Sequence, residues 1–471
     1  MSNSTGADTA FRCADEIRST VAPPWDVFGE RIRRYEIHFN GRTIEMVRGP
    51  IRLEGFGVRI FRPVGNELGV GFASSSLSSE KSARSIAEEA ERTLPFATFP
   101  ATRVELPARP VQSTGDLEIR DPRVWDRPQE TLEAVTHNIF EAFEGRTNES
   151  PSFGSVRASL IETTLSNSAG FTGAFAQTTL EFEIALKAFG GPEGPPPGEF
   201  WVNRLYRRIR PESLVEQISK WARLAQDARS AAPTPTGNFL ILLPADCLSE
   251  ILPPVFGYRL TAAARLREAS PERGLKYASP EVSIADDGRH PQGVLSAPFD
   301  DEGSATRRVP LIEQGVTQGL LYDSLYASAF GESSTGSARR GGLFGPDPWI
   351  HFSHAPAPKG TTITLESGEG GSNAELIESI SDGILVEQLG WAFPDPVSAN
   401  FGGELRIGYR IRRGKIAEPI RGGTVGGAVL GPPGKATLLN SIVALGSYPE
   451  LHGQLHGPAC VTNGLTVAGS D

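Results

Sequence analysis

Residues 283–341 read SIADDGRHPQGVLSAPFDDEGSATRRVPLIEQGVTQGLLYDSLYASAFGESSTGSARRG. Short apolar runs alternate in this stretch with turns made of glycine, aspartate and serine, a pattern that is typical of short strands joined by tight turns. The same texture continues to about residue 430. We therefore expect the C-terminal half of the chain to be rich in β-structure.

The start and the end of this half carry further patterns. FLILLP at 239–244 predicts a buried strand. The helix that follows should be interrupted by Pro253 and Pro254, because proline lacks the N–H that a helix needs. A last helix is predicted at about 435–445. Its expected buried residues are Leu438, Leu439, Ile442 and Val443.

The N-terminal half mixes hairpins with helices. Alternating runs flank turns at Asn40-Gly41 and at Gly65-Asn66, and each arrangement predicts a β-hairpin. Apolar residues spaced three and four apart predict helices at about 129–144 and 211–230. This half is therefore expected to be an α+β domain.

A change of texture suggests where the domains meet. AAPTPTGN at 231–238 is rich in proline and small residues, as linkers are. The sequence thus predicts an α+β fold with an N-terminal α+β domain at 1–230, a linker at 231–238 and a β-rich C-terminal domain at 239–471.

Composition narrows the class of protein. The 471 residues include 39% hydrophobic residues and carry a net charge of −10, which favours a folded domain without the basic face that nucleic acid requires. The first twenty residues contain no apolar segment, and Phe239–Leu243 is too short to cross a bilayer. Three scattered cysteines form no disulfide framework. We expect a cytoplasmic protein without nucleic-acid or membrane partners.

The search for a metal site finds little. No HExxH motif, GxSxG elbow or phosphate-binding glycine loop is present. The best metal-like spacing is that of His452, His456 and Cys460 in LHGQLHGPAC. Glycine and proline make a sustained helix unfavourable there, so a surface loop is the simpler interpretation. We assign no metal ligands in this chain and keep these three residues as the alternative.

Two other groups of residues contain side chains that can bind a metal ion or share a proton. His351 and His354 are three apart, so on a strand they would point to opposite faces. The acidic run Phe299–Gly303 could share a proton or hold a cation. A turn in which the aspartates cap backbone N–H groups and Gly303 takes a positive φ is the simpler interpretation. No catalytic residue is assigned, and the substrate-binding residues stay unidentified.

The order of short motifs through the opening stretch resembles that of a known family. Its motifs stand at Asp286-Asp287, Pro298–Gly303, Thr306–Arg308, Leu311–Gly315, Gly319–Asp323 and Ser334–Arg339. Flanking motifs stand at Gly55–Arg59, Gly71–Ser75, Asn167–Gly170, Gly383–Val386 and Leu465–Gly469. The chain resembles the TldD/PmbA family over nearly its whole length.

The resemblance implies a division of labour between two subunits. TldD-type subunits carry HExxxH, which holds a catalytic zinc together with a late cysteine, whereas TldE/PmbA-type subunits lack this motif and pair with the first kind. The corresponding place in this chain follows FLILLP and holds Ser249, Glu250 and Pro254. A hydroxyl and a proline cannot replace two imidazoles. The resemblance thus implies no zinc in this chain and a zinc ion in its partner.

Three functions remain as hypotheses. The first is the non-metal subunit of a heterodimeric zinc peptidase that cleaves unfolded peptides or a peptide-like biosynthetic intermediate, with a TldD-type paralogue as partner. The second is a homodimeric hydrolase that uses His452, His456 and Cys460. The third is a non-catalytic regulatory protein of the gyrase-modulator type, against which the acidic charge argues.

Overall fold

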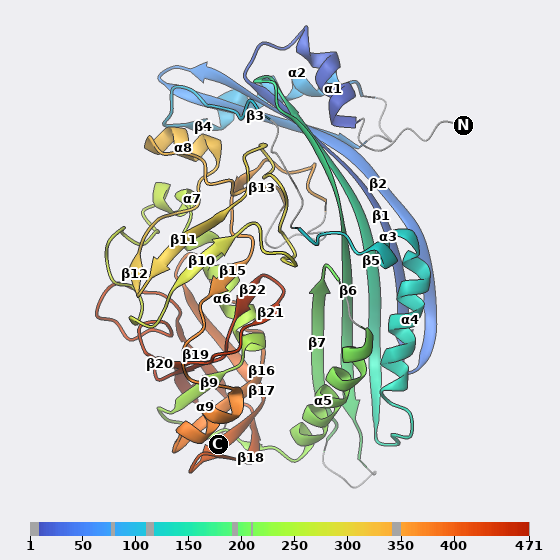
Figure 1. The fold of residues 1–471 in the computed structure, drawn as a ribbon, viewed down its shortest axis with the longest axis vertical. Coiled ribbons are helices and arrows are strands. Elements are labelled where there is room, and N and C mark those ends of the chain that lie inside the picture. The colour runs from blue at the N-terminus through green and yellow to red at the C-terminus, as the bar shows by residue number, and fades with distance from the viewer. Residues whose placement is uncertain are drawn as a thin grey trace.

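The computed structural model describes residues 9–76, 81–109, 117–190, 196–208, 211–341 and 350–470. A long, curved sheet from the N-terminal half runs along one side of the molecule, and the C-terminal half lies on the inner side of this curve (Figure 1). The α+β class predicted from the sequence is confirmed, with β-structure predominating.

The N-terminal sheet has seven antiparallel strands in the order β4-β3-β2-β1-β5-β6-β7. Both predicted hairpins are present, because Asn40 pairs with Thr43 and Val64 pairs with Glu67. The strands are β1 Trp25–Asn40, β2 Thr43–Val64, β3 Glu67–Ser76, β4 Thr98–Phe99, β5 Glu149–Asn167, β6 Thr172–Ala188 and β7 Gly198–Tyr206.

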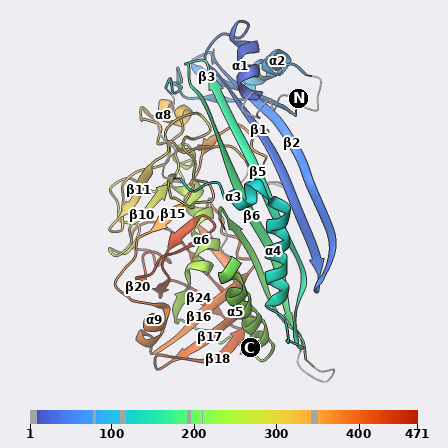
Figure 2. The same ribbon diagram turned by 45° about the vertical axis from the view of Figure 1, so that its right-hand side comes forward.

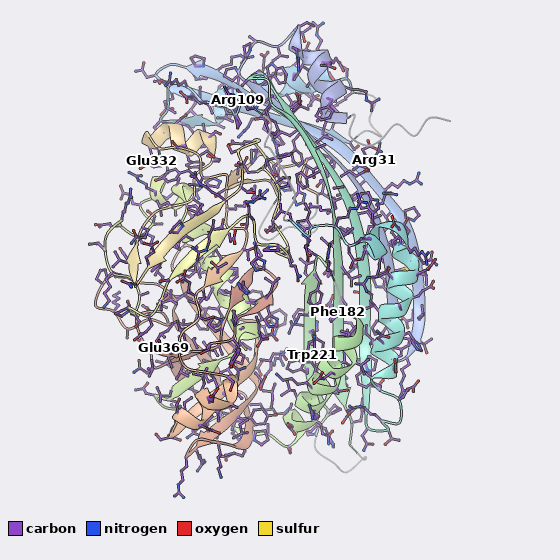
Figure 3. All side chains as sticks on the ribbon, in the orientation of Figure 1. Arg31, Arg109, Phe182, Trp221, Glu332 and Glu369 are labelled. Carbon is purple, nitrogen blue, oxygen red and sulfur yellow. The ribbon has the colours of Figure 1, made fainter. Side chains whose placement is uncertain are left out.

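Helices cover the sheet at both ends. Apolar residues of α1 and α2 share a core with β1 and β2, while α4 packs on β1 and β5 and α5 packs on β6 and β7 (Figure 2). Phe182 of β6 and Trp221 of α5 lie close together there, with ring centroids 6.2 Å apart (Figure 3). The predicted helices at 129–144 and 211–230 are thereby confirmed. The helices are α1 Thr9–Arg18, α2 Ala83–Thr93, α3 Pro122–Asp126, α4 Pro128–Glu141 and α5 Pro211–Arg229, with a 3₁₀ turn η2 at Leu94–Phe96.

The larger C-terminal sheet begins in the predicted linker. Ala232 and Pro233 form β8, which pairs in parallel with β18. The predicted buried strand is β9, and its residues Ile241 to Leu243 are fully buried. The strands of this sheet are β8 Ala232–Pro233, β9 Leu240–Leu243, β16 Asp382–Gly390, β17 Asn400–Arg412, β18 Lys415–Arg421, β19 Thr424–Ala428, β20 Ile442–Leu445, β23 Cys460–Thr462 and β24 Thr466–Ala468.

A smaller sheet and four helices complete the described part of this half. The helix α6 shares one hydrophobic core with strands of both sheets, so it lies between them. The six-stranded sheet comprises β10 Ile284–Asp287, β11 Arg308–Glu313, β12 Val316–Thr317, β15 Ile363–Leu365, β21 Glu450–His452 and β22 Leu455–Gly457. A short pair joins β13 Ala338–Arg339 to β14 Ala357–Pro358, and the helices are α6 Ala245–Arg259, α7 Ala262–Leu266, α8 Ser324–Phe330 and α9 Asn373–Ser379.

The prediction that prolines interrupt the helix after β9 is wrong. Helix α6 continues through Pro253 and Pro254 to Arg259. Ile251, Leu252 and their neighbours on the next turn are fully buried. Packing on both sides holds the helical path despite the missing hydrogen bonds, because tertiary burial outweighs local propensity.

The predicted last helix at 435–445 is also wrong. Residues 438–441 form a turn, and Ile442–Leu445 form strand β20, which pairs with β23. Ile442 and Leu445 are buried, whereas Val443 is 54% exposed. The side chains alternate with the period of a strand, so the apolar run that looked helical serves one face of a sheet.

Among the described residues, no helix combines the length and the apolar character that crossing a membrane requires.

Candidate functional site

A cavity of about 270 Å³ lies where the N-terminal sheet meets the C-terminal half. The sheet contributes side chains from β1, β5, β6 and the end of β7, and the C-terminal half contributes α6 and the segments around residues 295, 340 and 360. Its lining includes Phe28, Phe175, Leu205, Arg207, Pro253, Gly257, Val294, Asp301, Arg339, Arg340, His351 and Lys359. Cavities between two structural units are common ligand sites.

Helix α6 turns one face toward this region. Asp246, Glu250, Pro253 and Gly257 recur every three or four residues, so they share that face. A Cβ atom added at Gly257 would meet no atom within 4 Å, so there is free space for it beside the helix.

The first two turns of α6 carry carboxylates. Asp246 forms an ion pair with Arg204 of β7, and its Oδ1 lies 3.8 Å from Nδ1 of His452. Water reaches the Glu250 side chain, yet protein surrounds it on most sides. This desolvation, together with the charge of Asp246, raises the pKa of Glu250 to about 7. Glu250 can therefore exchange a proton near neutral pH.

A network of buried charges joins the two halves beside the cavity. Asp26 accepts from Arg59 Nη2 at 2.6 Å and from Arg340 Nη2 at 2.9 Å. Arg59 Nη2 also lies 2.7 Å from Glu302 Oε1, and all four side chains are almost completely buried. Buried charges need such partners, because an unpaired ion loses its hydration without compensation.

The acidic run 299–303 forms the predicted turn. Asp300 Oδ1 accepts from the N–H groups of Glu302 and Ser304 at 3.0 and 2.9 Å, and Gly303 has a φ of +95°. The sequence did not reveal its burial. Burial, followed by the charge of Glu302, raises the pKa of Asp300 to about 7. The turn is therefore buried where the two halves meet.

His351 lines the cavity, which no pattern in the sequence predicted. Residues 351–354 form a turn, so neither His351 nor His354 lies on a strand. His351 Nδ1 is 2.6 Å from Glu30 Oε1, and its backbone N–H donates to Glu30 Oε2 at 2.8 Å. Burial alone would lower the pKa of His351, but the nearby Glu30 carboxylate outweighs burial and raises it.

The three residues kept as an alternative metal site are not brought together. His452 and His456 belong to a hairpin of β21 and β22, in which His456 is paired with Leu451. Since paired residues share a face, His452 and His456 point to opposite faces. Cys460 is completely buried on β23, so the stretch is not a surface loop. Within the described ranges, no cluster of three or more His, Cys, Asp or Glu side chains could hold a metal ion.

The place that the resemblance reserves for zinc ligands does not fit that ion. Ser249 Oγ donates to the carbonyl oxygen of Asp246 at 2.6 Å, and Pro254 offers no donor atom from its side chain. Glu250 alone would remain as a ligand, whereas zinc sites in proteins use three or four side chains. We therefore derive no catalytic step through a metal on α6.

Sequence reasoning missed the cationic lining of the cavity. Arg207, Arg339 and Lys359 are distant in sequence and meet only through the fold. Arg339 and Arg340 stood within a recognised motif, but a pair of arginines in a Gly/Ser-rich segment has the appearance of a solvated surface.

Comparison with known proteins identifies family models and relatives that match this chain. Residues 236–469 match the family model of the PmbA/TldA metallopeptidase C-terminal domain, and residues 25–94 match that of PmbA/TldA metallopeptidase domain 1. A metalloprotease TldD homologue of Haemophilus influenzae is 29% identical over 202 residues, which are 42% of this chain and 40% of that protein. A metalloprotease of Methanothermobacter thermautotrophicus is 26% identical over 284 residues, or 60% and 58% of the two chains. These alignments thus span only about half of each relative.

Solved structures share the fold over the whole chain. TldE from Thermococcus kodakarensis superposes with a TM-score of 0.75 at 18% identity and covers 98% of this chain and 100% of that one. A Thermotoga maritima protein described as a candidate modulator of a DNA gyrase gives a TM-score of 0.78 at 17% identity, with 97% and 98% coverage. Since both family models match in the expected order, the chain belongs to the PmbA/TldD metallopeptidase family.

Proposed function

We propose that this chain is the subunit without catalytic zinc in a two-subunit peptidase of the TldD/TldE type. Its partner is a TldD-type paralogue that carries the zinc ion, and the substrate is an unfolded peptide or a peptide-like biosynthetic intermediate. This chain contributes one wall of the substrate cleft.

One observation carries the proposal. Pro253 and Gly257 of helix α6 line the cavity between the two halves. The helix carries Ser249, Glu250 and Pro254 at the positions that the resemblance assigns to the motif's two histidines and its glutamate. The helix is present, but two imidazoles at these positions are not. Such an arrangement suits a subunit that shapes a site and leaves the metal to its partner.

The seven-stranded sheet offers a way to hold a peptide. Strand β7 is its edge, and Trp201 on that strand is 42% exposed. An extended peptide binds an edge strand mainly through backbone hydrogen bonds, so little side-chain selectivity is needed. In this structure Gln388 bonds to the backbone of Trp201, and a peptide would have to displace that side chain.

The test is to co-express this chain with the TldD-type paralogue of the same source, purify the complex and count zinc. We expect a stable 1:1 complex with about one zinc ion, which is lost when the histidines of the paralogue's motif are replaced. Peptide cleavage should require both chains.

Matched variants of this chain separate the alternatives. His456→Ala and Cys460→Ala should leave the zinc content of the complex unchanged. A zinc-loaded homodimer of this chain alone that loses its metal in His456→Ala would overturn the proposal and support an independent hydrolase.

A further inference from the structure

The cavity carries more positive than negative charge. Its lining includes Arg207, Arg339, Arg340 and Lys359, whereas Asp301 is the one carboxylate among the described lining residues. Arg340 is already paired with Asp26 outside the lining, at 2.9 Å. Among the described residues, Arg207 and Lys359 form no ion pair, and Arg339 has only Asp301 at 3.6 Å, so the cavity favours an anion.

Arg207 holds its charge among neutral groups. Its guanidinium donates to Gln177 Oε1 at 2.8 Å, to the carbonyl of Thr178 at 3.0 Å and to that of Gly293 at 3.3 Å. Burial, and then the neighbouring charge of Arg339, lowers the pKa of Arg207 to about 9. A bound anion would offset both the loss of hydration at Arg207 and the repulsion between Arg207 and Arg339.

Arg339 has donors that remain unused. Its side chain is 9% exposed, and its nearest carboxylate oxygen, Oδ1 of Asp301, lies 3.6 Å from Nη1. The other Asp301 oxygen accepts from the backbone N–H of Arg340 at 2.5 Å. Nε and Nη2 of Arg339 are buried and have no acceptor among the residues that the structure describes. Buried donors without acceptors are rare and costly, so the Arg339 guanidinium is poorly compensated and an anion in the cavity that it lines would stabilise its charge.

The remaining wall is apolar. Phe28 and Phe175 approach from the sheet, while Pro253 and Val294 approach from the C-terminal half, with Leu205 beside them. A fully hydrated ion such as free phosphate would gain nothing from these side chains. A ligand with one anionic group and a short apolar body would use both parts of the cavity.

We propose that this cavity binds the free carboxylate of a peptide's last residue, with the Arg339 guanidinium on the carboxylate and an apolar last side chain against the aromatic wall. Arginine suits this task because its planar fork can bind both carboxylate oxygens. The identification of the ligand as a peptide rests on the proposed function, whereas the recognition of a carboxylate rests on the cavity alone.

The experiment is calorimetric titration of the purified full-length chain with three probes. We expect N-acetyl-leucine to bind and N-acetyl-leucinamide, which lacks the negative charge, to bind at least about tenfold more weakly. Inorganic phosphate should also bind more weakly than N-acetyl-leucine. Equal affinity for acid and amide, no detectable binding of the acid, or tighter binding of phosphate would each overturn the proposal.

Variants locate the binding to this cavity. Arg339→Gln should weaken N-acetyl-leucine binding about tenfold or more, and Gly257→Leu should abolish it by filling the space that opens beside α6. The control is Arg308→Gln, since Arg308 is an exposed arginine paired with Glu366 on another surface. A loss of affinity in Arg308→Gln equal to that in Arg339→Gln would refute the assignment.

These measurements are independent of the proposed function. The wild-type comparison of acid with amide needs neither a variant nor the zinc-bearing paralogue. If the paralogue fails to bind, the carboxylate site can still be demonstrated. If a zinc-containing complex forms but the acid does not bind, the proposed function survives and this inference falls.

Discussion

Arg59 Nη2 on β2 lies 2.7 Å from Glu302 Oε1 in the C-terminal half, and both side chains are at most 1% exposed. Asp26 on β1 binds the same guanidinium and also binds Arg340. Burial alone would lower the pKa of Arg59, but the two carboxylates outweigh it and raise it. The contact between the halves is therefore centred on charges that water cannot reach.

Removing the central cation should destabilise the protein strongly. In Arg59→Met, Glu302 loses its ion-pair partner and Asp26 keeps only Arg340 as a cation. Breaking a buried ion pair from one side costs about 3–5 kcal/mol, because the remaining charge stays buried. The free energy of unfolding, measured by urea titration, should fall by this amount.

An exposed ion pair provides the control. Arg84 and Glu88 on α2 are 3.2 Å apart and more than half exposed. Arg84→Ala should change the free energy of unfolding by no more than about 0.5 kcal/mol. Similar losses in Arg59→Met and Arg84→Ala would show that the buried network does not stabilise the contact between the halves.

Asp286 should make stability depend on pH. It is buried on β10, and this burial, opposed by hydrogen bonds from Thr361, raises its pKa to about 7. The unfolded value is about 3.9. The stabilising contribution of the neutral acid is complete below about pH 4 and is lost as the pH rises through about 7.

Asp286→Asn should remove this dependence. At pH 8 the variant should gain on the order of 3 kcal/mol relative to wild type, compared with the same difference at pH 4.5. Melting temperatures recorded from pH 4.5 to pH 8.5 measure the effect. Asp395→Asn is the control, since hydrogen bonds lower the pKa of this exposed carboxyl and its contribution is lost only in acid. Parallel curves for wild type and Asp286→Asn would contradict the prediction.

His351 should lose its raised pKa when Glu30 is neutralised. The Glu30 carboxylate outweighs the effect of burial, so in Glu30→Gln burial is opposed only by the smaller effect of Asp301. The His351 ring, followed by NMR titration, should then change charge below its ordinary pKa of about 6.5 instead of above it. Glu450→Gln, which changes the acceptor of His452 instead, should leave the His351 titration in place.

The sign of the linked stability follows from the same shift. A raised pKa means that the folded protein binds the proton more tightly than the unfolded chain does. The stabilisation is complete below about pH 6.5 and disappears as the pH rises through the folded-state pKa of His351. In Glu30→Gln this stabilisation should be absent.

The sequence predicted those elements whose signal lies within a few neighbouring residues. The hairpin at Gly41 needed only a turn residue that tolerates a positive φ, and its φ is +55°. The prediction of a helix over 442–445 failed because the apolar residues there suit the period of a helix as well as that of a strand. Pairing with β23 decides in favour of the strand. The prediction that Pro253 interrupts the helix also failed, because burial on both sides of α6 outweighs the cost of the missing backbone hydrogen bond.

The candidate site was harder to predict because its charges meet only in three dimensions. Arg207 follows the end of β7, Arg339 lies on β13 and Lys359 follows β14. No spacing in the sequence brings them together. The absence of imidazoles at Ser249 and Pro254, in contrast, is a property of single positions, and one sequence was enough to find it.

Alanine substitutions at two glycines test the packing around α2 and α6, and they should change the free energy of unfolding in opposite directions. A methyl group at Gly71 on β3 would lie 2.1 Å from the carbonyl oxygen of Ala90, so Gly71→Ala should destabilise the protein by about 1–3 kcal/mol. At Gly257 in α6 a methyl group meets no atom within 4 Å. Gly257→Ala should therefore stabilise it by about 0.4–1 kcal/mol, because alanine restricts the unfolded chain. Urea titrations of both variants give the comparison, and destabilisation by Gly257→Ala would show that α6 has no free space beside the cavity.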